Sequence, residues 1–319
     1  MIRFPLSITS PSGRHGRLSI LIFHRVLPKA DPLFPDLPSV ADFEERMRWV
    51  AAWFNVLPLQ QAVERLFEGS IPARALAITF DDGYADNEQV AAPVLRKYGL
   101  CSTFFVSTGF LDGGCMWNDR VIEAVRACAK DRLDLSAFGL GVYLLDSAPA
   151  RRRCIDDILK RIKHLKQGER DATTRGIVSA ADGGHAPALM MTPQQVRSLR
   201  NMGMEIGAHT QTHPILTRLR PDAALAEIRE GKTELEAILD EPVELFAYPN
   251  GVPGQDYSAV HAEMVRSCGF KAAVSTASGA ASTRSDRYQL PRFTPWDRTR
   301  LRFGARLLLN LRQTEAMAA

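Results

Sequence analysis

Two short polar motifs carry the side chains of this sequence that are best suited to metal-dependent chemistry. The run TFDDG contains the adjacent carboxylates Asp81 and Asp82, and the run HTQTH places His209 and His213 four residues apart. Open divalent-metal sites that activate water are commonly built from two histidines and one carboxylate. The second aspartate would then remain free to act as a base. The four side chains together therefore predict a metal-dependent hydrolase.

Each motif follows an apolar run that we interpret as a buried β-strand. Residues 75–79 lead into the aspartate pair, residues 204–208 lead into His209, and a third run at 19–23 ends at His24. Further short strands are expected at 103–106, 245–248, 272–275 and from 290 onward, with helices at 42–54, 59–67, 86–97, 192–203, 221–239 and 258–268.

The alternation of continuous apolar strands with helices implies a parallel sheet that is covered on both faces. Either a barrel or an open sheet would satisfy this pattern. In α/β barrels the catalytic groups collect at the carboxyl ends of the strands. Because both polar motifs come directly after a strand, their position favours the barrel.

Two segments depart from the alternation. Residues 112–188 hold helix-like stretches at 119–129 and 150–166, and we interpret them as a helical insertion between two barrel strands. This insertion either shapes one wall of a substrate cleft or serves only as a packing subdomain. The C-terminal segment at about 297–313 mixes arginines and leucines in the pattern of a basic amphipathic helix. Such a helix can make peripheral membrane contact, although most such helices pack on their own domain.

Composition excludes few functions. The chain has 319 residues and a net charge of +4, which is too weak an excess to indicate a nucleic-acid partner. No apolar run is long enough for a signal peptide or a membrane span. The expected location is the cytoplasm, because the five cysteines form no C-x-x-C pair and suit reduced thiols: Cys101, Cys115, Cys128, Cys154 and Cys268.

The two motifs resemble those of the polysaccharide deacetylases, the NodB-homology group of carbohydrate esterase family 4. A third hallmark of that group, a proline-containing loop after a later strand, is present as FAYPNG at 246–251. The resemblance covers roughly residues 18–292. One motif alone would be weak, because Asp-Asp-Gly is a common turn. Two motifs in the correct order, each after a strand, form a much more specific signal.

The resemblance implies a distorted, incomplete (β/α) barrel of about seven parallel strands, built as one domain over residues 1–319. It also implies that Asp82, His209 and His213 hold a divalent metal, usually zinc, while Asp81 is the general base. Two neutral imidazoles and one carboxylate leave the ion most of its charge, which would polarise an acyl oxygen. The ordinary alternative is a helix-capping aspartate and two hydrogen-bonded loop histidines.

Three departures from the family pattern need replacements. Ala247 stands where many members have an arginine that orients the base, and Arg292, after the last expected strand, is the candidate substitute. No histidine follows His261 to protonate the leaving group. His24 is the candidate for that role, because the run FHRV resembles the opening motif of exopolysaccharide deacetylases.

The third departure lies in the proline-containing loop, where Tyr248, Pro249 and Asn250 are the expected substrate and oxyanion residues. Family members often have tyrosine in place of Asn250. The oxyanion role needs only a backbone N–H group, so Asn250 can still fill it.

The expected reaction is hydrolysis of the acetamide of an N-acetylhexosamine in a polysaccharide or a glycan precursor, which releases acetate. An O-acetyl esterase or another amide hydrolase on the same scaffold is the first alternative. A catalytically silent sugar-binding relative is the second, favoured by Ala247 and the absent late histidine but opposed by the intact aspartate and histidine motifs.

Overall fold

The structure is a computed structural model that describes residues 3–183, 187–295 and 297–313. The chain divides into two compact units. The barrel unit comprises Met1–Lys29, Pro38–Leu111 and Met191–Ala319, and the helical unit comprises Ala30–Leu37 and Asp112–Met190.

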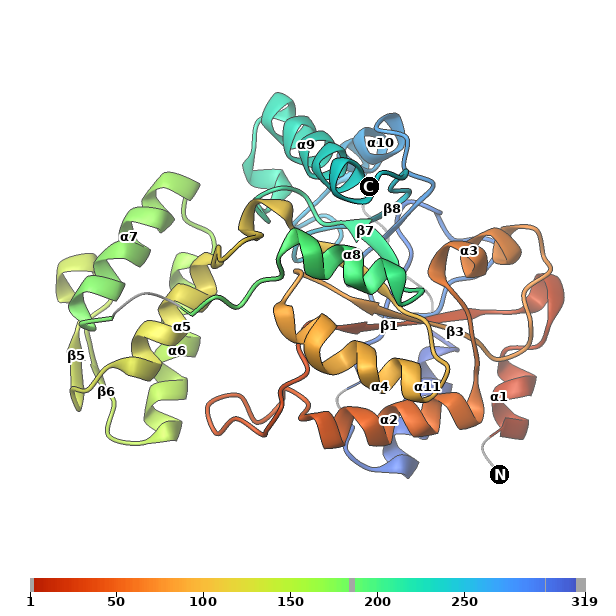
Figure 1. Ribbon diagram of the computed structural model, residues 1–319, viewed down its shortest axis with the longest axis horizontal. Coiled ribbons are helices and arrows are strands. Elements are labelled where there is room, and N and C mark those ends of the chain that lie inside the picture. Colours follow the sequence, from red (N-terminus) through yellow and green to blue (C-terminus); the bar gives the residue numbers. More distant parts are fainter. Residues whose placement is uncertain (1–2, 184–186, 296, 314–319) are drawn as a thin grey trace. The chain divides into compact units, whose positions relative to one another are not determined.

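The barrel unit is built on a curled parallel sheet that forms an incomplete barrel, which confirms the expected fold (Figure 1). Neighbouring strands follow the order β1-β3-β4-β7-β8-β9, and β2 pairs with the first residues of β3. The strands are β1 (Leu18–Phe23), β2 (Asn55–Val56), β3 (Ala75–Phe80), β4 (Thr103–Val106), β7 (Glu205–Ala208), β8 (Leu245–Ala247) and β9 (Ala272–Val274).

Alternate residues of β1 and β3 enter two separate apolar clusters. Leu21 and Phe80 belong to the larger cluster, whereas Ile20 and Ala77 belong to a second cluster that includes one face of α3 (Leu59–Phe67). Every residue of β1 and β3 is buried. This burial on both faces explains why these strands are continuous apolar runs.

Seven further helices belong to the described part of the barrel unit, and Figure 1 shows α2, α4, α8 and α9 lying outside the strands. Two of them begin at residues that form reciprocal capping boxes. Thr192 and Gln195 form a reciprocal capping box at α8, and Ser39 does the same with Asp42 at α2. The helices are α1 (Arg3–Thr9), α2 (Val40–Trp53), α4 (Ala92–Lys97), α8 (Pro193–Asn201), α9 (Pro221–Leu239), α10 (Ala259–Ser267) and α11 (Arg300–Asn310).

The segment after β9 closes the gap between the last strand and the first. The Leu290 N–H donates to the Ala273 carbonyl of β9, and the Phe293 N–H donates to the Ile20 carbonyl of β1. The sequence predicts a strand from 290 onward, but the structure has only isolated bridges here. Pro291 lacks the N–H group that a regular ladder would need.

The apolar face of α11 packs on its own unit. Phe303 and Leu307 are fully buried, and Phe303 lies against the rings of Trp49 and Trp53. Two of the apolar residues of this helix are therefore occupied in packing, whereas Leu301 and Leu309 are exposed. None of the described helices combines the length and the apolar character needed to cross a membrane.

The helical unit has its own apolar core. Its elements are α5 (Trp117–Ala127), α6 (Ala148–Ile162), α7 (Gln167–Ala180) and an antiparallel hairpin of β5 (Arg132–Asp134) and β6 (Val142–Leu144). Val121, Ile158 and Ile177, one from each helix, are buried in this core. The sequence indicates the first two helices but neither α7 nor the hairpin, and residues 184–186 of the expected insertion lie outside the described residues.

Candidate metal centre

The two polar motifs meet at the carboxyl ends of β3 and β7. Asp82 Oδ1 lies 3.4 Å from His209 Nε2 and 3.3 Å from His213 Nε2. The three potential ligand atoms all lie within 4.8 Å of one another. Asp82 Oδ1 is buried and accepts no hydrogen bond from any described residue. A buried carboxylate oxygen without a donor, facing two imidazole nitrogens, fits a divalent cation.

The backbone at these ligands adopts a conformation that side chains other than glycine seldom take. Asp82, Thr210 and His213 have φ angles of 78°, 62° and 55°, respectively. Such left-handed residues cost of order 1–3 kcal/mol each and persist where the surroundings determine them fully. One local support is visible here, since the Thr210 hydroxyl accepts from the His213 N–H at 3.1 Å.

His209 is oriented by β8. Its Nδ1 lies 2.7 Å from the carbonyl oxygen of Ala247. Because a carbonyl oxygen can only accept, Nδ1 carries a proton and donates it, and in the neutral imidazole the Nε2 lone pair then faces Asp82. Burial would lower the pKa of His209, but Asp81 and Asp82 outweigh it and raise that pKa. Ala247 therefore contributes to the centre through its backbone, although its side chain cannot replace the family arginine.

Burial and charge set the protonation states of Asp82 and His213. Burial opposes ionisation of Asp82, but the neighbouring histidines His209 and His213 outweigh it and hold the pKa of Asp82 well below its usual range. Burial lowers the pKa of His213 to about 4, and the attraction of Asp82 offsets only part of this effect. At neutral pH Asp82 is ionised and His213 is neutral, which are the states that bind metal.

Asp81 forms a buried, bidentate ion pair with Arg292. Arg292 Nη1 and Nη2 donate to Asp81 Oδ1 and Oδ2, both at 2.7 Å. The guanidinium is held by further bonds from Nε to the Ser275 carbonyl and from Nη1 to the Thr79 hydroxyl. Burial alone would raise the pKa of Asp81, but Arg292 and then His209 lower it below its usual value.

The alternation of side chains along each segment produces this pair. Ala77 of β3 lies in the cluster that contains α3, and Asp81 follows on the same side four residues later. Leu290 lies in that cluster as well, so Arg292 points to the same side two residues on. The guanidinium thus reaches Asp81 from the closing segment rather than from the loop after β8.

His24 lies at the same end of the barrel, directly after β1. Its side chain is exposed and is close enough for its charge to help lower the pKa of Asp82. The backbone of His24 is bound by a residue of the π-helical turn η2 (Asn87–Ala91): Asn87 Nδ2 donates to the His24 carbonyl at 2.8 Å. The preceding residue, Asp86, accepts from the Val26 N–H and from Arg25.

The three expected substrate and oxyanion residues lie in different surroundings. Tyr248 is fully buried, stacks on Tyr257 with ring centroids 3.8 Å apart, and donates its hydroxyl proton to the Tyr288 carbonyl. Its N–H is bonded to a carbonyl of β9, so Tyr248 has a packing role. Pro249 is buried and has no N–H group. Asn250 is half-buried with φ 60°, and its N–H makes no hydrogen bond to a described residue.

Three supporting side chains were not singled out by the sequence. Asn87 is one of them, Ser107 donates to the His209 carbonyl at 2.8 Å, and Glu227 of α9 binds the loop between the two histidines. Each acts on a backbone group far away in the sequence. No local motif marks such contacts.

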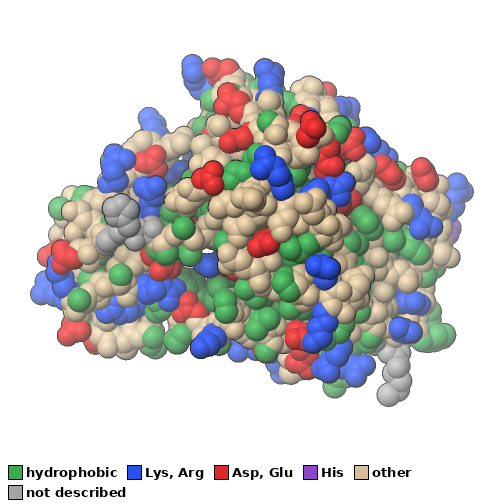
Figure 2. All heavy atoms as spheres, viewed as in Figure 1, with side chains coloured by type: hydrophobic (Ala, Val, Ile, Leu, Met, Phe, Trp, Pro, Cys, Tyr) green, Lys and Arg blue, Asp and Glu red, His purple; other side chains and the backbone are tan. Residues whose placement is uncertain are grey.

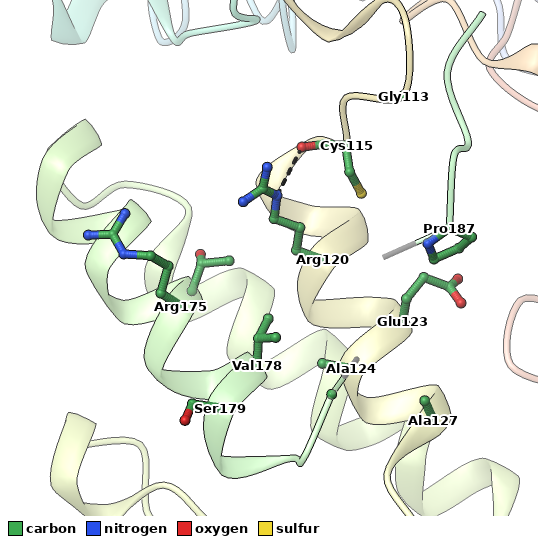
Figure 3. A pocket seen from close by; sticks show the side chains of 12 residues that line it. Gly113, Cys115, Arg120, Glu123, Ala124, Ala127, Arg175, Val178, Ser179 and Pro187 are labelled. Atoms are coloured by element: carbon green, nitrogen blue, oxygen red, sulfur yellow. Dashed lines mark hydrogen bonds between the residues drawn. The ribbon is translucent and has the colours of Figure 1, made fainter. Parts of the chain in front are cut away.

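A cavity of about 560 Å³ lies within the helical unit and holds none of the predicted site residues. Figure 3 shows Arg120 and Glu123 of α5 and Arg175 and Val178 of α7 around it, with Arg120 bonded to the Cys115 carbonyl. Both arginines are exposed on the surface. The cavity is therefore a feature of the helical unit itself.

The incomplete barrel brings its Asp-Asp and His-His motifs together in one candidate metal centre, and comparison with known proteins gives the family. Residues 68–273 match the polysaccharide deacetylase family, so the chain belongs to that family. Membership makes it a hydrolase of amide or ester bonds in acetylated carbohydrates.

Individual relatives are distant but cover most of the chain. The polysaccharide deacetylase homologue YxkH of Bacillus subtilis (strain 168) is 22% identical over 279 residues, which is 87% of this chain and 71% of YxkH. The deacetylase PplD of Streptococcus pyogenes, solved with acetate, has a TM-score of 0.58 at 19% identity and covers 87% of this chain and 92% of its own. IcaB of Ammonifex degensii has a TM-score of 0.59 at 17% identity, and the match covers 95% of this chain and 99% of IcaB.

Proposed function

We propose that this chain is a zinc-dependent N-deacetylase that hydrolyses the acetamide of an N-acetylhexosamine in an exopolysaccharide or its precursor. The observation that carries the proposal is the convergence of Asp82, His209 and His213 beside the buried Asp81–Arg292 pair. The acetate found with the related PplD is the product that this reaction would release.

The roles follow from the positions of the side chains. Asp82, His209 and His213 would hold the ion, which when bound supplies Lewis-acid polarisation and positive charge. Asp81 would take a proton from the attacking water, and Arg292 keeps Asp81 ionised and fixed in orientation.

Two further groups complete the reaction. The N–H of Asn250 would donate to the oxygen that gains negative charge when water adds to the acetyl carbon. His24, at the same end of the barrel, would protonate the nitrogen as the carbon–nitrogen bond breaks. The products are acetate and a free amino sugar, so one water is consumed for each bond broken.

Acetate release separates the proposed reaction from its alternatives. The purified chain should release acetate from N-acetylglucosamine oligomers, from nucleotide-linked and from lipid-linked N-acetylhexosamines, with a preference for one of these groups. Faster release from O-acetylated xylan than from all three would identify an esterase. Binding of the oligomers without any acetate release would identify a silent sugar-binding protein.

Partners and location are part of the same proposal. Residues 112–188 are proposed to be an insertion in a single catalytic domain. The cytoplasm is the proposed compartment, since the five cysteines form no disulfide with one another in the described part of the chain. Peripheral membrane contact through α11 finds no support, because Phe303 and Leu307 are buried. Nucleic acid is not a proposed partner, and Figure 2 shows acidic and basic side chains interspersed on the face drawn.

A further inference from the structure

The loop between His209 and His213 is bound by one carboxylate from α9. Glu227 Oε2 accepts from the Gln211 N–H at 3.0 Å and from the Thr212 N–H at 2.8 Å. Glu227 Oε1 accepts from the Thr212 hydroxyl at 2.6 Å. Both oxygens of this half-buried side chain are thus used on the two residues that connect the histidines.

The backbone of α9, the helix that carries Glu227, lies in close contact with the backbone of this loop. A Cβ atom added to Gly231, one turn further along α9, would lie 2.7 Å from the carbonyl carbon and oxygen of Thr210. Real Cβ atoms do not come that close, so only glycine permits this contact. Glu227 and Gly231 therefore form one face of α9 that fits the loop backbone.

The other side of the loop is held by the turn η3 (Thr108–Phe110). The Gly109 N–H donates to the Gln211 carbonyl at 2.8 Å, and a Cβ atom on Gly109 would lie 2.9 Å from that oxygen. The polar backbone groups of Gln211 are consequently satisfied from two different elements. The loop has little freedom to change shape while these contacts exist.

These contacts of the loop affect the positions of the metal ligands, because the backbone of the loop is strained at both ends. Thr210 and His213 are left-handed, a conformation that an unsupported loop would leave. If the loop relaxed, His213 Nε2 would move away from Asp82 Oδ1, which now lies 3.3 Å from it. The contacts of Glu227 oppose this relaxation without touching any of the three ligand side chains.

We propose that Glu227 is a positioning residue of the metal centre: its hydrogen bonds to the 211–212 backbone hold His209 and His213 ready for the ion. The proposal rests on the proposed metal-dependent function. It assigns Glu227 to the affinity for a divalent cation rather than to the chemical step. Partners that orient metal ligands typically change metal affinity by about 10- to 100-fold when they are removed.

The test compares variants of the full chain after removal of metal by a chelator. The affinity for Zn²⁺ is measured by competition with a chromophoric chelator, and the ligand geometry by the visible spectrum of Co²⁺. Glu227→Ala should weaken Zn²⁺ binding about 10- to 100-fold and change the Co²⁺ spectrum. Glu227→Gln should stay within about fivefold of the parent, since its amide keeps an acceptor and gains a donor for Thr212.

Glu230→Ala is the matched control, because Glu230 lies on the same helix and is exposed. It should bind Zn²⁺ within about twofold of the parent, as expected for a surface change. Unchanged Zn²⁺ affinity in Glu227→Ala would overturn the proposal, and so would equal weakening by Glu227→Ala and Glu227→Gln. A parent chain that binds no Zn²⁺ would instead refute the proposed function itself.

Glu227→Ala could also fail to fold, which circular dichroism of the metal-free protein would reveal. Thr212→Val then carries the test, because it removes only the hydroxyl bond to Glu227 Oε1. The loss of one such bond should weaken Zn²⁺ binding about two- to tenfold. A folded Thr212→Val variant with the affinity of the parent would overturn the proposal.

Discussion

Replacement of Arg292 by methionine should destabilise the metal-free protein in a way that depends on pH. The change removes a side chain that is 0% exposed and whose guanidinium makes two bonds of 2.7 Å to Asp81. Methionine has a similar length and can fill much of the same space. The main consequence is therefore electrostatic, because a buried carboxylate loses its counter-charge. Removing one partner of a buried ion pair costs about 3–5 kcal/mol.

The size of the loss can be worked out from proton uptake. Without Arg292 the chain can keep Asp81 buried only by protonating it, since burial raises the pKa of this group. Protonating a carboxyl group with an ordinary pKa of 3.8 costs about 4 kcal/mol at pH 7 and about 1 kcal/mol at pH 4.5. These costs are upper bounds on the electrostatic destabilisation of the Arg292→Met variant at each pH, because protonation of Asp81 is always open to it.

The contribution of Asp81 to the unfolding free energy changes with pH in opposite directions in the parent and in Arg292→Met. In the parent the pKa of Asp81 is lowered, so its contribution to stability is present above pH 3.8 and is lost only as pH falls through the folded-state value. In the variant the folded-state pKa is raised, so stability is lost as pH rises above 3.8. The difference in unfolding free energy should therefore grow between pH 4.5 and pH 7.

Urea unfolding in the presence of a chelator, at pH 4.5 and at pH 7, measures this difference. Arg284→Met is the control, because Arg284 is exposed and should change the unfolding free energy by less than about 0.5 kcal/mol. A loss for Arg292→Met that is equal at the two pH values, or below about 1 kcal/mol at pH 7, would contradict the reasoning.

Three further outcomes follow from the geometry of the site. Asp81→Asn should keep the metal and lose about 10²- to 10⁴-fold in acetate release, whereas Asp82→Asn should weaken metal binding; identical behaviour of the two would show that the roles are wrongly divided. His24→Ala and Asn87→Ala should both slow turnover with metal affinity unchanged, because Asn87 holds the His24 backbone; a weaker metal site in either would contradict this assignment. Tyr248→Phe should cost about 1 kcal/mol in unfolding free energy by the loss of one buried hydrogen bond. Slower acetate release at unchanged stability would contradict this and support the expected substrate role.

The parts of the site that the sequence predicts are those governed by strand position. Asp82 and His209 each follow a continuous apolar run, and parallel strands bring their carboxyl ends to one edge. The place of Arg292 after the last apolar run likewise brings it to that edge. Strand alternation also accounts for Tyr248, since Phe246 and Tyr248 lie in the larger cluster while Ala247 lies in the other.

Contacts that depend on the path of the chain in space could not be predicted. Glu227 is one of several polar residues on α9, and nothing in the helical pattern shows that it meets the histidine loop. The expected helix at 86–97 begins as the π-helical turn η2, which directs Asn87 to the His24 carbonyl. The helical unit likewise includes residues 30–37, which join it only through long-range packing.

Metal titration of the chelated enzyme tests the role of Asp82, His209 and His213 most directly. Acetate release from N-acetylglucosamine oligomers should fall to background after chelation and return linearly with added Zn²⁺ up to one ion per chain. His209→Ala should show no return over the same range, because two ligands seldom hold the ion against a chelator. Full acetate release by the chelated parent, or recovery in His209→Ala at one equivalent of Zn²⁺, would contradict a catalytic metal at this centre.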